Sequence, residues 1–180
     1  MRSARTNRLI LCAFFAALSA ALSQIVIPIG PVPIVLTHIS IFMSVGLLGV
    51  KYGVLSQVVF VFTGAVGIPV FHGFSGGMGV IFGPTGGFIA GYVACAFVTG
   101  ILISKFGTGV KIMIPAMCAG WVATYSLGIP WFMYVTNMNL QTTLLYMAVF
   151  LPGDLLKTIC SIVLITRLRK ALSDQWLNIN

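Results

Sequence analysis

The chain has 180 residues, of which 59% are hydrophobic and only 7% are charged. Soluble domains carry about 25% charged residues, so this composition excludes an ordinary soluble domain and favours a single bundle of helices in a lipid bilayer. The net charge of +8 does not indicate nucleic-acid binding, because the basic residues are scattered between apolar stretches. There they suit anionic headgroups and the rules of membrane insertion better.

Six apolar stretches are candidates for membrane-spanning helices, which need about 20 residues to cross the hydrocarbon core. In chain order these predicted spans cover residues 9–27, 34–50, 52–69, 84–104, 111–128 and 140–166. Only Lys51 separates the second from the third, which predicts a tight helical hairpin. The N-terminal stretch also resembles a signal peptide, but its apolar character continues through Ile27, so we expect a retained helix.

The basic residues predict the orientation of these spans, since Lys and Arg accumulate in short cytoplasmic loops. With six crossings, one side of the membrane holds nine of the ten basic residues, namely Arg2, Arg5, Arg8, Lys51, Lys105, Lys111, Arg167, Arg169 and Lys170. Five or seven crossings would divide them between the two sides. We therefore predict an all-α integral membrane protein, a single domain over residues 1–180 with six transmembrane helices. A basic N-terminal segment (1–8) and a C-terminal tail (171–180) are both expected in the cytoplasm.

The three predicted outer connections, over residues 28–33, 70–83 and 129–139, are longer than the inner turns and contain no formally charged residue. They are rich in Gly, Pro and aromatic residues. This pattern predicts a ligand pocket that opens to the extracellular side and is covered by these loops. The aromatic candidates are Phe71, Phe74, Trp131, Phe132 and Tyr134. An aromatic belt at the membrane interface is the alternative, above all for Trp131 and Tyr134.

Asp154 and Lys157 lie within the last apolar span, one helical turn apart, so their side chains share a face. Either charge alone near the bilayer centre costs about 2.5–3.5 kcal/mol on insertion scales, and charges kept there are usually functional. Pro152 and Gly153 precede the pair and predict a kink or break, which would place Asp154 in the first turn of a half-helix. We expect a polar anchor in a membrane cavity; the alternative is an ion pair that only locks helices together.

Small residues recur at intervals of four and predict close approach of helix backbones. In the first span they are Ala13, Ala17 and Ala21, for which packing is favoured and contact with another protein is the alternative. In the fourth they are Gly83, Gly87 and Gly91, which suit either packing or approach to a ligand. Thr85 can satisfy free N–H groups at the start of that helix, and Gly86 would let a ligand touch the backbone.

No GxxxxGK[ST] phosphate loop is present, and the glycines at 77 and 79 do not continue as GxGxxG. We therefore expect no ATP hydrolysis by P-loop chemistry, and active transport would take its energy from a partner or an ion gradient. The four cysteines, Cys12, Cys95, Cys118 and Cys160, fall in predicted spans without CxxC spacing. They are expected to pack as apolar residues rather than to hold a metal ion.

One pattern favours an enzyme. Residues 73–77 match the GxSxG nucleophile motif with Ser75 at its centre, and His38 or His72 would act as base. Against this, Ser75 lies in a long glycine-rich loop without the strand-to-helix elbow of hydrolases, and His72 is very close in sequence. An intramembrane serine hydrolase that uses Ser75 therefore stays as the alternative from a different class.

Five blocks occur in order along the chain: PIGPVPI at 28–34, LLGVKYG at 47–53, GIPVF at 67–71, GPTGGF at 83–88 and PGDLLK at 152–157. Together they resemble the BioY family, the biotin-binding S components of energy-coupling factor (ECF) transporters. The resemblance implies a multi-pass protein of the bacterial plasma membrane that captures biotin from outside. It also implies a transmembrane coupling subunit and two cytoplasmic ATPases as partners, with ATP hydrolysed by those partners and no cofactor on this chain. An S component for another small vitamin is the alternative within this class.

The resemblance also implies roles for individual residues. The Asp and Lys of the PGDLLK block, here Asp154 and Lys157, are expected at the biotin site, to bind the ureido ring or the carboxylate. The alanines of the first helix are expected to dock the coupling subunit. Thr37 stands where the family commonly has Gln, and Val50 where it frequently has Pro. The full predicted site comprises Asp154, Lys157, Thr37, Phe71, Phe74, Thr85, Gly86 and Trp131.

Overall fold

The computed structural model describes residues 4–28 and 32–171. Arg2, Pro31 and most of the predicted C-terminal tail lie outside these residues. The described part contains seven α-helices: α1 (Ala4–Ser23), α2 (Thr37–Ala65), α3 (Met78–Ile81), α4 (Gly86–Phe106), α5 (Val110–Thr136), α6 (Leu140–Ala148) and α7 (Leu151–Ala171). Two short strands, β1 (Val26–Ile27) and β2 (Ile34–Val35), form an antiparallel ribbon, and η1 (His72–Phe74) is a 3₁₀ turn. The predicted all-helical class is therefore confirmed.

Four described helices are long and apolar enough to cross a membrane, namely α1, α2, α4 and α5. The last predicted span is divided, because α6 and α7 meet at an angle of 46° and pass the same test only as a pair. Pro152 lies in the first turn of α7, where its missing N–H is tolerated. Asp154 lies in the same first turn, so the predicted break before it is confirmed.

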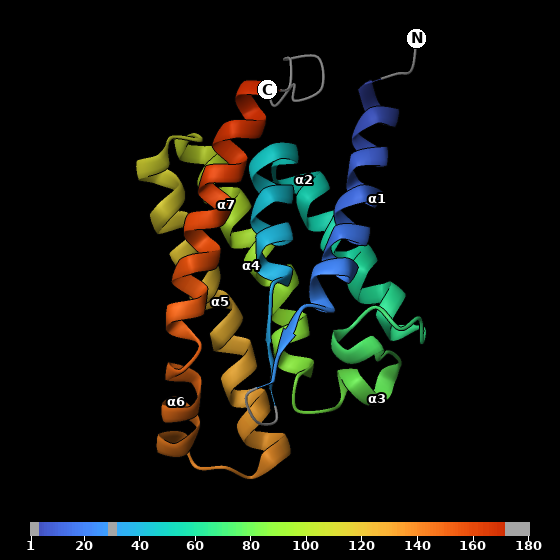
Figure 1. Ribbon diagram of the computed structural model, residues 1–180, viewed down its shortest axis with the longest axis vertical. Coiled ribbons are helices and arrows are strands. Elements are labelled where there is room, and N and C mark those ends of the chain that lie inside the picture. Colours follow the sequence, from blue (N-terminus) through green and yellow to red (C-terminus); the bar gives the residue numbers. More distant parts are fainter. Residues whose placement is uncertain (1–3, 29–31, 172–180) are drawn as a thin grey trace.

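The predicted hairpin is present inside α2. Gly49 interrupts the helix with φ 75° and ψ −179°, a conformation that favours glycine. Residues eight apart in a straight helix would be separated by about 12 Å. Here a Cβ on Gly53 would lie 2.8 Å from the Cα of Val45, so the two limbs of α2 run side by side (Figure 1). The reversal is at Gly49, two residues before Lys51.

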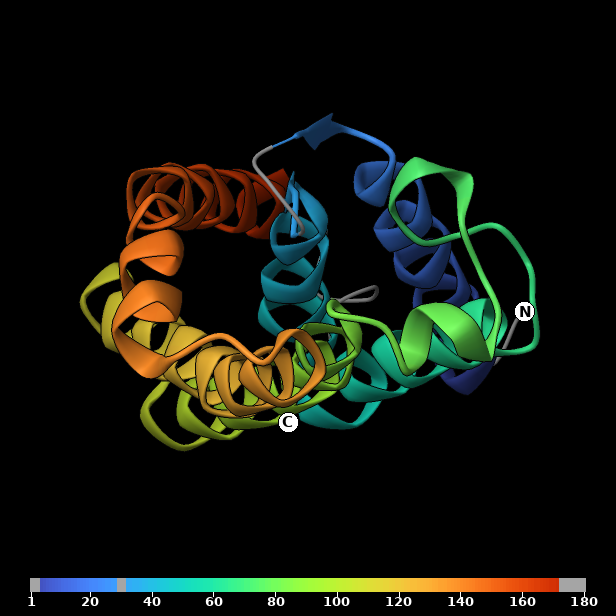
Figure 2. The ribbon, with the colours of Figure 1, turned by 90° about the horizontal axis from the view of Figure 1, so that it is seen from below.

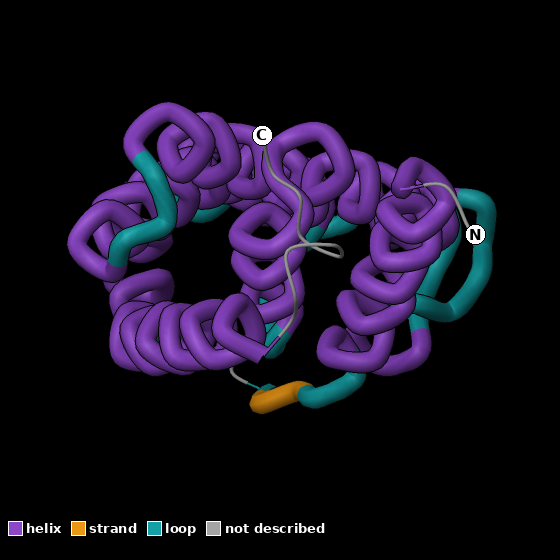
Figure 3. The backbone as a smooth tube through the Cα atoms, turned by 90° about the horizontal axis from the view of Figure 1, so that it is seen from above, coloured by secondary structure: helices purple, strands orange, loops and turns teal. Residues whose placement is uncertain are grey.

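The long helices run along one axis of the molecule (Figure 1). Viewed along that axis, α1 and α7 flank the first limb of α2, and α4 packs against both α2 and α5 (Figure 2). The β1–β2 ribbon lies at one margin of the helical bundle (Figure 3). The start of α1, the hairpin turn of α2, the α4–α5 connection and the end of α7 share one end of the molecule (Figure 1). The basic residues of these segments therefore gather at that end.

The stripe of glycines in α4 is used for helix packing. A Cβ on Gly87 would lie 2.4 Å from the Cβ of Trp131 and 2.7 Å from the carbonyl oxygen of Leu127, both in α5. A Cβ on Gly91 would lie 3.0 Å from the Cα of Thr124. At these two positions the packing interpretation is confirmed. On α1, by contrast, the three alanines of the predicted docking stripe are exposed.

Arg169 ties three segments together at the basic end of the molecule. Its Nε donates to the carbonyl oxygen of Gly46 at 3.0 Å, and its Nη1 donates to Thr108 Oγ1 at 2.5 Å. The last turn of α7 is thereby joined to the first limb of α2 and to the α4–α5 connection. These charge-assisted bonds close the bundle at the end remote from the cavity described next.

Candidate ligand-binding site

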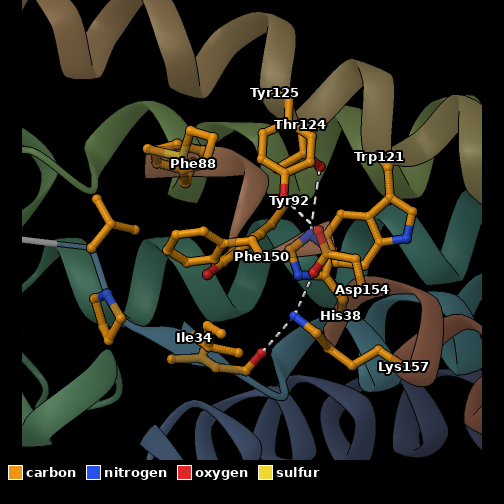
Figure 4. A pocket seen from close by; sticks show the side chains of 14 residues that line it. Ile34, His38, Phe88, Tyr92, Trp121, Thr124, Tyr125, Phe150, Asp154 and Lys157 are labelled. Carbon is orange, nitrogen blue, oxygen red and sulfur yellow. Dashed lines mark hydrogen bonds and ion pairs between the residues drawn. The ribbon is translucent and has the colours of Figure 1, made fainter. Parts of the chain in front are cut away.

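A cavity lies between α2, α4, α5 and α7, beside strand β2 (Figure 4). The β1–β2 ribbon lies away from the basic end of the molecule (Figure 1). It measures about 390 Å³ including its mouth, and the centre of a water molecule can reach about 40 Å³ of it. Fourteen residues line it: Val32, Pro33, Ile34, Val35, His38, Phe88, Tyr92, Trp121, Thr124, Tyr125, Met147, Phe150, Asp154 and Lys157. The walls are mostly apolar with a few polar groups, as is usual for small-molecule sites.

Asp154 and Lys157 form a buried ion pair in the wall of this cavity. Lys157 Nζ lies 2.8 Å from Asp154 Oδ1, and each residue is only 5% exposed. Two further bonds support the pair: the hydroxyl of Tyr125 donates to Asp154 Oδ2, and Lys157 Nζ donates to the carbonyl oxygen of Val35 at 3.3 Å. Lys157 Nζ also lies 5.0 Å from the centre of the Trp121 ring. Both charges are thus compensated, and both stay in contact with the cavity.

Aromatic rings form the wall beside the ion pair. The His38 and Trp121 rings are stacked, with centroids 3.9 Å apart and an angle of 26° between their planes. Tyr125 continues the stack on Trp121 at 6.1 Å, and Tyr92 meets His38 edge-on at 5.1 Å. The indole N–H of Trp121 donates to Thr158 Oγ1 at 3.0 Å, which holds the ring in place. Flat rings around a polar pair suit a ligand that is part ring and part polar group.

Sequence reasoning did not select Tyr92, Trp121, Thr124 or Tyr125. One signal was available: Trp121, Thr124 and Tyr125 follow a spacing of three and four, so they share one face of α5. Aromatic and polar residues on one helix face are nevertheless common in membrane helices. Only the contact of this face with α7 shows that it belongs to a ligand site.

The other predicted site residues lie around the cavity or away from it. Phe71 and Thr85 line a smaller neighbouring compartment, which shares Val32, Pro33, Val35, Phe88 and Tyr92 with the first. Thr37 is fully buried but lines neither space.

Besides Thr37, three further predicted residues line neither compartment: Phe74, Trp131 and Gly86. Phe74 is 74% exposed. The indole N–H of Trp131 donates to the carbonyl oxygen of Gly83 at 2.9 Å, which joins α5 to the residues just before α4. Gly86 begins α4, where a Cβ would overlap the carbonyl oxygen of Ile81.

Ser75 and the two histidines do not form a catalytic dyad. Ser75 Oγ donates to the backbone carbonyl of His72 at 2.7 Å rather than to an imidazole. His38 lines the cavity, with its Nε2 3.5 Å from Thr124 Oγ1. Among the described residues, no group of three or more His, Cys, Asp or Glu side chains is placed to hold a metal ion.

Tyr146 of α6 fastens the connection that covers the cavity. Its hydroxyl donates to the carbonyl oxygen of Val32 at 2.8 Å and accepts the N–H of the same residue at 3.0 Å. The ring stacks on Phe132 at 5.8 Å and meets Phe150 edge-on. One side chain therefore holds the backbone that enters β2, whose residues line both compartments.

We expect Tyr146→Phe to loosen this connection without disturbing α6, because the ring packing stays and two hydrogen bonds are lost. At about 1 kcal/mol for each bond, amide hydrogen exchange over residues 32–36 should accelerate by about tenfold or more. Tyr134→Phe, at a residue that is 79% exposed, is the matched control and should leave exchange unchanged. Equal exchange in the two variants would show that Tyr146 does not hold the connection.

Fold and site together define a helical membrane protein with a polar pair inside a small, largely apolar ligand cavity. Within that class, the chain belongs to the BioY family, whose sequence model matches residues 1–174. The biotin transporter BioY of Thermotoga maritima is 36% identical over 168 residues, covering 91% of this chain and 96% of the relative. The biotin transporter BioY of Lactococcus lactis is 36% identical over 155 residues, or 80% of each chain. A crystal structure of the S-component for biotin from an ECF-type ABC transporter superposes with a TM-score of 0.86, at 34% identity over 92% of both chains.

Proposed function

We propose that this chain is the biotin-binding S component of an ECF-type transporter and that it captures biotin in the cavity described above. The observation that carries the proposal is the buried Asp154–Lys157 pair in the cavity wall. Relatives named as biotin transporters, together with the superposed S-component for biotin, support the choice of ligand. Membership of a transporter family also speaks against the serine hydrolase alternative.

The same proposal includes the membrane topology. Six crossings result if α1, the two limbs of α2, α4, α5 and the bent α6–α7 pair each cross once. Because the basic residues gather at one end, the positive-inside rule assigns that end and both termini to the cytoplasm of a bacterial cell. The cavity near the β1–β2 ribbon then opens toward the extracellular side. This orientation suits a protein that collects its ligand from outside.

The chemistry of the site fits biotin. Asp154 has lone pairs left to accept N–H groups of the ureido ring, and Lys157 can donate to the ureido carbonyl or pair with the carboxylate. Trp121, Tyr125 and Tyr92 would cover the apolar ring system. If the two adjoining compartments join around the elongated ligand, Phe71 and Thr85 would contact it as well. The four predicted site residues that line neither compartment would affect biotin binding only through the residues beside them. They are Thr37, Phe74, Gly86 and Trp131.

The partners follow from the transporter class. The chain has no phosphate-binding loop, so ATP would be hydrolysed by two cytoplasmic ATPases that reach it through a transmembrane coupling subunit. The exposed alanine stripe of α1 offers a flat surface on which a helix of that subunit could pack closely. No cofactor is required on this chain.

Equilibrium binding to the purified protein tests the proposal. We expect biotin to bind far more tightly than riboflavin or thiamine, and Ser75→Ala to bind biotin like the unmodified protein. Phe62→Ala, at an exposed position of α2, is the control for the effect of a substitution on the protein in detergent, and it should bind biotin like the unmodified protein. Tighter binding of riboflavin or thiamine would instead support an S component for another vitamin. Labelling of Ser75 by an active-site serine probe would support the hydrolase.

A further inference from the structure

His38 lies in the first turn of α2 with its ring in the cavity wall, and it is only 5% exposed. Stacking on Trp121 and the edge contact with Tyr92 hold the ring on two sides. Figure 4 shows it between Thr124, Trp121 and Asp154. Packing therefore maintains the orientation of the imidazole, and the partners of its two nitrogen atoms decide what the ring can bind.

The hydrogen bonds of Thr124 indicate which ring nitrogen of His38 carries the proton. The threonine hydroxyl has a single proton, and carbonyl oxygens of Gly120 and Gly91 lie 3.1 and 3.4 Å from its oxygen. When the hydroxyl donates to one of them, it faces His38 Nε2, 3.5 Å away, as an acceptor. The neutral ring then carries its proton on Nε2 and presents a lone pair at Nδ1.

The Nδ1 atom of His38 is buried and has no hydrogen-bond partner among the described residues. An acceptor left unpaired in this way costs about 1–3 kcal/mol, so a group that supplies a donor recovers that cost. The neighbouring carboxylate does not share this need, because Lys157 and Tyr125 already donate to the two oxygens of Asp154. Compared with the Asp154 carboxylate, the Nδ1 atom of His38 therefore gains more from an N–H donor supplied by a ligand.

We propose that His38 is a specificity-determining residue whose Nδ1 accepts one N–H group of a cyclic urea, while Asp154 accepts the other. This inference rests on the proposed function and goes beyond it, because it assigns the ureido end of biotin to the Asp154–His38 side of the cavity. The bicyclic ring of the ligand would lie beside the stacked Trp121. The flexible carboxylate chain then extends toward the neighbouring compartment lined by Phe71 and Thr85.

The test compares three ligands and two variants by equilibrium binding. The ligands are biotin and the two derivatives that carry a methyl group on one or the other ureido nitrogen. Each derivative therefore lacks one of the two N–H donors of biotin. In His38→Phe the ring can keep its packing on Trp121 and Tyr92 but has no acceptor, and we expect the affinity for biotin to fall by about tenfold. His38→Asn places an amide oxygen near the position of Nδ1 and should retain most of the affinity.

The methylated ligands separate recognition from a structural effect. For the derivative that lacks the contacting N–H, His38→Phe should cause no further loss, since the bond is already absent. Thermal unfolding of ligand-free His38→Phe should occur at the same temperature as in the unmodified protein or higher, because a buried unpaired acceptor is removed. If His38→Phe weakens all three ligands by the same factor, or leaves biotin binding unchanged, the inference is wrong.

Two results keep the inference distinct from the proposed function. If the unmodified protein does not bind biotin, the proposed function fails before His38 is tested. If His38→Phe does not fold, His38→Gln replaces it, because its longer side chain places the amide near Nε2 instead of Nδ1. Asn should then bind biotin more tightly than Gln, and the reverse order would overturn the assignment.

Discussion

Lys157→Met should sharply reduce the amount of folded protein. The substitution keeps a long side chain against Trp121 but leaves the Asp154 carboxylate buried with only the Tyr125 hydroxyl as a side-chain partner. Removing one partner of a buried ion pair typically costs about 3–5 kcal/mol, a large part of the stability of a small protein. The fraction that elutes as a single species in size-exclusion chromatography and the thermal unfolding midpoint measure the effect.

The double variant Asp154→Asn/Lys157→Met separates folding from binding. Because it removes both charges, we expect folded yield close to that of the unmodified protein together with loss of biotin binding by at least about a hundredfold, since charge-assisted bonds are lost. Lys105→Met, at an exposed position near the end of α4, is the control for loss of one positive charge. A double variant that still binds biotin normally would refute the role of the pair, whatever its stability.

Gly87→Ala should destabilise the bundle through the α4–α5 contact. The added methyl group would lie 2.4 Å from the Cβ of Trp131 and 2.7 Å from a backbone oxygen, so the two helices must separate. Overpacking of this kind costs about 1–3 kcal/mol. Because Tyr92 and Trp121 stand on these same helices, biotin binding should weaken together with the unfolding midpoint.

Gly79→Ala is the matched control for Gly87→Ala. Gly79 also lies in a helix, but nothing is within 4 Å of a Cβ added there, so the same change should be neutral or slightly stabilising. Equal unfolding midpoints for the two variants would show that the close approach of α4 and α5 can relax at little cost.

Several features of the fold were predictable because they depend on local or periodic properties. The long apolar helices follow from stretches of about 20 apolar residues. The bend before α7 follows from Pro152 and Gly153, and the α2 hairpin from a glycine-rich turn at Lys51. Asp154 and Lys157 stood out because isolated charges within an apolar span are expensive. Their placement in a cavity wall agrees with that reasoning.

Loop composition was a weaker guide to the remaining site residues. The aromatic content of the loops indicated poorly hydrated connections, but not the direction of each side chain. Phe71 turns inward to the neighbouring compartment, whereas Phe74, three residues later, is largely exposed. Trp131 is not in a loop: the predicted connection over residues 129–139 is wrong up to Thr136, where α5 ends, and the indole N–H of Trp131 donates from that helix to the residues before α4. The direction of a loop side chain depends on which helices the loop joins and how they pack.

The sequence alone therefore determined the class of the protein, the pattern of helices and the central charge pair, since these depend on hydrophobic length, glycine and proline positions, and the cost of charge in lipid. The tertiary structure decided which groups surround that pair. His38, Tyr92, Trp121 and Tyr125 come from three different helices, and nothing in their local sequence encodes their meeting. Their contacts are set by close packing between helices that are distant in the chain, so the walls of the cavity emerge only when the bundle is assembled.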